Sequence, residues 1–117
     1  MYRVMCKAKI DNAVITRKDA NYSGSIGIDQ KILQATNIYP NEMVQVLNRN
    51  NGSRFETYVI PEKEGSGTIA LFGPACRLGE VGDEIIILSK GLFEGKESPN
   101  VEIKIITLGK NNSILKK

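Results

Sequence analysis

The sequence contains no histidine and no tryptophan, and only two of its 117 residues are cysteine. Cys6 and Cys76 are too few and too far apart for a disulfide framework, and no histidine is present to complete a zinc site. We therefore expect both cysteines to be reduced packing residues and expect no metal.

Long hydrophobic runs are also missing. Charged residues interrupt every short apolar stretch in the first 40 residues, so neither a signal peptide nor a membrane-spanning segment is expected, and the cytoplasm is the predicted location. With 41% hydrophobic residues, the chain is long enough for one modest core and too short for two ordinary domains. A single domain over residues 1–117 is predicted.

The net charge of +3 is small but unevenly placed. Residues 1–24 hold five basic and two acidic residues, whereas residues 25–117 hold eleven of each sign. The first segment would attract a small anion. Nucleic acid is less favoured, because the basic surplus is small and aromatic residues make up only 6% of the chain. A small barrel that binds an anion or nucleic acid without catalysis is one alternative.

The local patterns predict a β-rich chain with one short helix. Asp29 is the expected N-cap of a helix over residues 30–35, and Asn50-Asn51-Gly52 predicts a hairpin turn. Residues 98–100 and 109–117 are expected to form loop or loosely held tail. Strands are predicted at residues 4–11, 13–16, 43–47, 55–60, 68–72, 85–88 and 103–108.

Residues 40–46 and 81–87 share a short pattern, in which an Asn-Glu or Asp-Glu turn precedes an apolar run. Many short strands with a duplicated turn and strand favour a closed β-barrel of two related halves, which would leave no exposed sheet edge. Coincidence between two turns is the other interpretation.

An ordered set of short motifs runs through most of the chain. Its parts are Met5 with Lys9, Tyr22-x-Gly24-Ser25-x-x-Ile28-Asp29, Asn41-Glu42, Asn51-Gly52-x-Arg54-Phe55-x-Thr57-Tyr58, Gly73-x-Ala75 and Val81-Gly82-Asp83. At this spacing the set resembles the bacterial aspartate 1-decarboxylases, pyruvoyl enzymes that make β-alanine for pantothenate synthesis. The resemblance implies a mainly β fold, a six-stranded double-psi β-barrel with short helices, assembled as a homotetramer.

The resemblance also implies that the chain cleaves itself between Gly24 and Ser25. The products would be residues 1–24 (the β chain) and residues 25–117 (the α chain), which begins with a pyruvoyl group made from Ser25. Glycine suits the first position, because a residue without Cβ tolerates the crowded geometry of an N→O acyl shift. Thr57 is expected to stabilise the oxyanion at the Gly24 carbonyl. Whether a partner protein promotes this cleavage is left open.

The remaining site residues follow from the same resemblance, with L-aspartate as substrate. Its amine would form a Schiff base with the pyruvoyl ketone, which accepts electrons as the α-carboxylate leaves. Tyr58 is the expected proton donor to Cα, although it should face opposite to Thr57 on a regular strand. Arg54 is expected to bind the side-chain carboxylate, with Lys9 as the second cation. Gly73 and Ala75 would add backbone contacts.

Two positions depart from the family pattern. Asp11 stands where a histidine is usual, and Phe72 stands where an asparagine is usual. An anion at position 11 should weaken the binding of a dianionic substrate unless it turns away or pairs with Lys9. Neither departure replaces a residue that is expected to cleave the chain, so processing is expected to survive more surely than turnover. A homologue with another substrate, or with defective processing, is therefore the second alternative.

Overall fold

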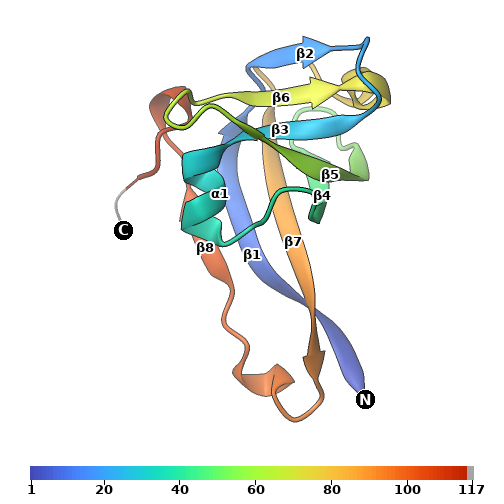
Figure 1. Cartoon of the computed structure of the whole chain (residues 1–117), viewed down its shortest axis with the longest axis vertical. Coiled ribbons are helices and arrows are strands. Elements are labelled where there is room, and N and C mark those ends of the chain that lie inside the picture. The colour runs from blue at the N-terminus through green and yellow to red at the C-terminus, as the bar shows by residue number, and fades with distance from the viewer. Residues whose placement is uncertain (116–117) are drawn as a thin grey trace.

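The computed structural model describes residues 1–115, in which eight strands form one hydrogen-bonded ladder (Figure 1). The order along the ladder is β2-β6-β3-β5-β4-β7-β1-β8. The strands are β1 (Tyr2–Val14), β2 (Arg17–Asp19), β3 (Ser25–Asp29), β4 (Met43–Asn48), β5 (Arg54–Glu62), β6 (Ile69–Phe72), β7 (Glu84–Glu94) and β8 (Lys104–Thr107). The helical elements are α1 (Gln30–Thr36) and three 3₁₀ turns, η1 (Gly73–Leu78), η2 (Ser98–Asn100) and η3 (Lys110–Asn112).

The predicted mainly β class with short helices is confirmed. The strand order, in which β3 runs parallel to β5 and antiparallel to β6, is compatible with a double-psi β-barrel. The described ladder has eight strands rather than six, because the short strands β2 and β8 add one at each end. β2 was not predicted, since its three residues are all charged and show no apolar alternation.

The core lies between strands rich in β-branched residues. Every residue of β3 and of β6 is buried, so these strands are covered on both faces. Isoleucine dominates the fully buried side chains, which suits a pleated surface because its χ1 is already restricted. None of the helices within residues 1–115 is long or apolar enough to cross a membrane.

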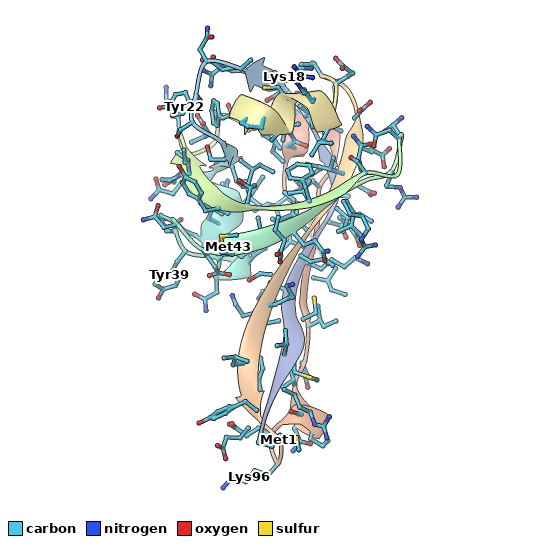
Figure 2. The ribbon with its side chains drawn as sticks, turned by 90° about the vertical axis from the view of Figure 1, so that its right-hand side faces the viewer. Met1, Lys18, Tyr22, Tyr39, Met43 and Lys96 are labelled. Atoms are coloured by element: carbon cyan, nitrogen blue, oxygen red, sulfur yellow. The ribbon has the colours of Figure 1, made fainter. Side chains whose placement is uncertain are left out.

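The first half of β1 and the last half of β7 leave the core as a two-stranded arm (Figure 1). Figure 2 shows Met1 and Lys96 together at the far end of this arm. β8 joins β1 only at residues 8–11, so the earlier part of β1 pairs with β7 alone. Val4, in that part of β1, is consequently 65% exposed.

The predicted helix is confirmed as α1, with Asp29 as its N-cap. The Asp29 carboxylate accepts hydrogen bonds from the backbone N–H groups of Lys31 (2.8 Å), Gly65 (3.0 Å) and Gly67 (2.8 Å). One buried carboxylate therefore caps the helix and holds the loop between β5 and β6. The helix ends at Asn37, whose left-handed conformation lets its N–H bond back to the last turn.

The predicted hairpin is also confirmed, as β4 and β5. Gly52 adopts a positive φ of 76° in the five-residue connection between them. The two turns of the faint repeat precede β4 and β7, which are antiparallel neighbours. Their origin as two related halves stays a prediction.

The expectation of a loosely held tail is wrong for its described part. Asn112 is 3% exposed, donates to the carbonyls of Val14 (2.9 Å) and Gly67 (2.8 Å), and accepts from the Val14 N–H (2.9 Å). No local pattern could reveal partners 98 and 45 residues away. Residues 116–117 lie outside the described residues. Residues 98–100, also expected as loop, form η2 with Ser98 buried.

Three lysines of the basic first segment are paired with acidic residues. Their Nζ atoms lie 3.1 Å from Glu42, 3.7 Å from Asp11 and 3.0 Å from Glu80, for Lys7, Lys9 and Lys18 respectively. Local ion pairs thus offset much of the charge that suggested an anion-binding segment.

The Glu42 carboxylate accepts hydrogen bonds from several groups in addition to its ion pair with Lys7. Burial alone would raise its pKa, but hydrogen bonds from the Ser89 hydroxyl, the Tyr39 N–H and Lys7 outweigh this effect and lower the pKa. Its backbone carbonyl also accepts from the Val59 N–H (3.1 Å), next to Tyr58 on β5. Glu42 therefore ties β1, β5 and β7 together at the start of β4.

We predict that Glu42→Gln lowers the free energy of unfolding by about 1–2 kcal/mol at pH 7, because charge-assisted hydrogen bonds are lost. A carboxyl whose pKa falls on folding stabilises the protein above the unfolded pKa of about 4.3, and this contribution disappears as the pH falls through the lower, folded pKa. Urea unfolding at pH 7 and at about pH 3 measures the effect. The prediction is contradicted if the difference in unfolding free energy between wild type and variant is as large at about pH 3 as at pH 7.

Candidate active site

Ser25 begins β3 and lies between two neighbouring strands. It pairs with Phe72 of β6 on one side. On the other side Ile26 pairs with Val59 in a parallel register, which sets Ser25 level with Tyr58 of β5. The register of β3 thus brings the serine of the predicted cleavage site beside the Thr57-Tyr58 pair.

The backbone before Ser25 takes a conformation that favours glycine. Gly24 has a φ of 126°, and Gly73, at the start of η1, has a φ of 64°. A Cβ on Gly73 would lie 2.6 Å from the Tyr22 carbonyl oxygen and 2.7 Å from the Gly24 nitrogen. Gly73 is therefore required for close backbone packing against the Gly24-Ser25 junction.

The Ser25 hydroxyl is fully buried and has no hydrogen-bond partner among residues 1–115. An unsatisfied buried hydroxyl costs about 1–3 kcal/mol and calls for an explanation. A nucleophile that is not held by another group is available to attack the adjacent carbonyl. This orphaned hydroxyl fits a residue that is to be converted into a prosthetic group.

A cleft of about 420 Å³ lies over this junction. Four residues of the predicted site line it, namely Gly24, Ser25, Thr57 and Tyr58, and Ala75 of η1 is a fifth. Gly73 lies just beneath, against the Gly24 backbone. The structure therefore brings together the processing residues and the expected proton donor.

Thr57 and Tyr58 do lie on opposite faces of β5, as its alternation predicts. Thr57 pairs with Val44, which is 1% exposed, whereas Tyr58 pairs with Met43, which is 55% exposed. Both nevertheless line the cleft, together with Ser25 at the start of β3. Thr57 faces the core, whereas Tyr58 is the residue that lies level with Ser25.

The two predicted substrate cations do not line the cleft. Lys9 lies on the outer face of the sheet, in the cross-strand row Lys9-Leu88-Gln45-Glu56. Three strand spacings separate the backbones of Lys9 and Glu56, about 14 Å. Arg54 is exposed on the same face of β5 as Tyr58. Lys9, Arg54 and Tyr58 thus share an outer face, but of these three only Tyr58 lines the cleft with Ser25.

The two departures from the family pattern have clear surroundings. Phe72 is 2% exposed, its ring centroid lies 4.7 Å from that of Tyr22, and the Arg17 guanidinium lies 5.4 Å above it. This aromatic packing holds the loop before Gly24, and the asparagine expected from the family pattern would not supply it. Asp11 Oδ1 lies 3.7 Å from Lys9 Nζ, so of the two arrangements considered for Asp11 the structure shows the pairing with Lys9.

The cleft also has walls that the sequence did not indicate. Met43, Glu56, Pro74 and Leu78 line it, together with Ser23 and Phe55. Glu56 adds a negative charge, and its only sequence signal was its place between Arg54 and Thr57.

A larger cavity of about 770 Å³ lies elsewhere, between the start of α1 and η3. Its buried polar groups, Asp29 and Asn112, already have hydrogen-bond partners, so we place the candidate site at the orphaned Ser25 hydroxyl instead. No three His, Cys, Asp or Glu side chains within residues 1–115 gather in a way that would hold a metal ion.

We predict that Gly73→Ala slows cleavage after Gly24 at least tenfold and lowers the free energy of unfolding by about 1–3 kcal/mol, because its Cβ displaces the cleavage loop. Gly52→Ala is the matched control. Gly52 also has a positive φ, but no atom lies within 4 Å of its added Cβ. Mass spectrometry over time and thermal unfolding measure the two effects, and equal cleavage rates in both variants would disprove the role of Gly73.

Comparison with known proteins agrees with the family resemblance of the motifs. The profile of the aspartate decarboxylase family matches residues 1–115. A Listeria monocytogenes protein named aspartate 1-decarboxylase is 48% identical over 114 residues, which cover 97% of this chain and 90% of that protein. A Desulfitobacterium hafniense protein of the same name is 47% identical over 116 residues, covering 99% and 91%. The chain therefore belongs to the aspartate decarboxylase family.

Proposed function

We propose that this protein is a self-processed aspartate 1-decarboxylase, which converts L-aspartate into β-alanine and carbon dioxide. The observation that carries the proposal is the buried Ser25 hydroxyl, which has no hydrogen-bond partner among the described residues and directly follows Gly24. The names of the relatives support the reaction. A role in pantothenate synthesis and a cytoplasmic location follow as part of the same proposal.

The processing step uses residues of this chain alone. The Ser25 Oγ attacks the Gly24 carbonyl carbon, the Thr57 hydroxyl donates to the oxyanion, and the peptide C–N bond breaks to leave an ester. Loss of the Ser25 Cα proton and cleavage of its Cβ–O bond release a Gly24 carboxylate and leave a dehydroalanine. Addition of water and loss of ammonia then give the pyruvoyl group.

In turnover, that group would supply a ketone for the substrate's amine and an electron sink for the electrons left by carbon dioxide. Tyr58 lines the cleft level with residue 25 and is the proposed donor of the proton to Cα.

A second copy of the chain completes the proposed site. The cleft within one chain contains neither Lys9 nor Arg54, yet both lie with Tyr58 on one outer face. If that face packs against the cleft of a neighbouring copy, the two cations reach the side-chain carboxylate of the substrate. The homotetramer implied by the family resemblance provides such interfaces.

One observation favours the alternative of a different substrate. Lys9 is already paired with Asp11 at 3.7 Å, so its charge is partly compensated before any dicarboxylate binds. The pair is loose and both side chains are partly exposed, which makes the interaction weak. An activity assay across aspartate, glutamate and neutral amino acids distinguishes the two functions.

We predict that Ser25→Ala yields one uncut, inactive chain of about the full 12.9 kDa. The unchanged protein should give two fragments, with the larger one lighter than a serine-started chain by the mass of one ammonia. Ser23→Ala is the matched control, because Ser23 lines the same cleft two residues earlier. Intact-mass analysis after long incubation measures cleavage in the wild type and in both variants. A wild-type protein that remains a single uncut chain would refute self-processing.

We further predict that two inactive variants complement each other when coexpressed. Ser25→Ala retains Arg54, and Arg54→Ala retains Ser25, so a site shared between copies is complete when each variant supplies its intact residue. Random assembly should restore about a quarter of the wild-type activity. Recovery no greater than the activity of the Arg54→Ala protein would show that the site lies within one chain.

A further inference from the structure

Glu56 introduces a negative charge where the proposed substrate would bind. It lines the cleft between the neighbours Phe55 and Thr57, and its side chain is 49% exposed. A free carboxylate there would repel an anion that approaches Ser25. A cleft for a dicarboxylate therefore needs something that compensates Glu56.

Lys90 provides that compensation from another strand. Its Nζ lies 2.9 Å from the Glu56 carboxylate, in a hydrogen-bonded ion pair. β4 runs between their two strands, and the pairs Val44-Ser89 and Gln45-Glu56 place the lysine one step along the sheet from the glutamate. The ammonium thus crosses β4 on the outer face, beside Met43, which also lines the cleft.

We propose that Lys90 is a specificity-determining residue for anionic substrates. By pairing with Glu56 it cancels the one acidic side chain among the described residues that line the cleft, and it draws that carboxylate toward β7. Loss of Lys90 leaves the cleft negative and shifts its preference away from dicarboxylates. The inference rests on the proposed function and concerns the same cleft.

The pair can be tested without damage to the fold. Both side chains are about half exposed, at 41% and 49%, and exposed ion pairs contribute little to stability. The effect on an incoming anion is different in kind, because it depends on the net charge at the cleft and not on the strength of the pair. Variants of this pair should therefore change substrate affinity while leaving the free energy of unfolding nearly unchanged.

The experiment compares Lys90→Met, Glu56→Gln and the double variant. For Lys90→Met we expect the KM for aspartate to rise about five- to tenfold at low salt, with kcat and self-cleavage within twofold of wild type. The double variant should return KM to within twofold of wild type, because the uncompensated charge is gone. Added salt should reduce the effect of Lys90→Met.

Lys96→Met is the matched control, because it makes the same change in net charge at the far end of the arm (Figure 2). An equal rise of KM in this control would overturn the inference, since it would show an effect of total charge. An unchanged KM in Lys90→Met would also overturn it. If the KM of the double variant stays as high as that of Lys90→Met, Lys90 contacts the substrate directly and the compensating role is overturned.

A binding measurement keeps this inference separate from the reaction. The dissociation constant of succinate, a dicarboxylate without the amine, is measured by calorimetry in the uncleaved Ser25→Ala background. Weaker binding after Lys90→Met, restored by Glu56→Gln, supports the inference even if the wild type decarboxylates no aspartate. Succinate that binds equally to all variants, or to none, refutes it.

Discussion

The candidate site depends on the tight packing of one backbone segment. Gly73 approaches the Tyr22 carbonyl and the Gly24 nitrogen so closely that no side chain fits between them. This contact fixes the end of the loop, and the pairing of β3 with β5 and β6 then fixes Ser25 inside the sheet. An otherwise unexplained buried hydroxyl is the result. Burial of the isoleucine-rich core around β3 and β6 offsets the energetic cost of this close packing and of the unsatisfied hydroxyl.

The alternation of β5 divides the proposed chemistry between two faces. Thr57 faces the core, whereas Tyr58 and Arg54 face outward. Thr57 and Tyr58 both line the cleft of one chain, whereas Lys9 and Arg54 do not. Under the proposed function, these two cations would reach the substrate from the outer face of another copy.

Local signals in the sequence were sufficient for several elements. Asp29 before an apolar helical run and Asn51-Gly52 between two β-rich segments act within a few residues, and the helix and hairpin both formed as predicted. Asn112 could not be predicted in the same way, because its partners Val14 and Gly67 are distant in sequence. The length of the arm was missed as well, since no packing pattern marks strands that leave the core.

The same distinction applies to the site. Gly24, Ser25, Thr57 and Tyr58 were identified from a family resemblance, and the register of β3 explains why such separated motifs belong together. The contact between Glu56 and Lys90 was beyond sequence reasoning, because it depends on which strand separates β5 from β7.

Charge compensation across strands recurs around this face of the sheet. Glu42 pairs with Lys7, and Glu56 pairs with Lys90, each joining strands that are not neighbours in sequence. The first pair is the more buried and adds a hydrogen bond from Ser89, so it chiefly serves stability. The second lies at the cleft, where the same pairing controls which charge a ligand meets. Similar ion pairs therefore have different consequences, and burial and position relative to Ser25 decide which one prevails.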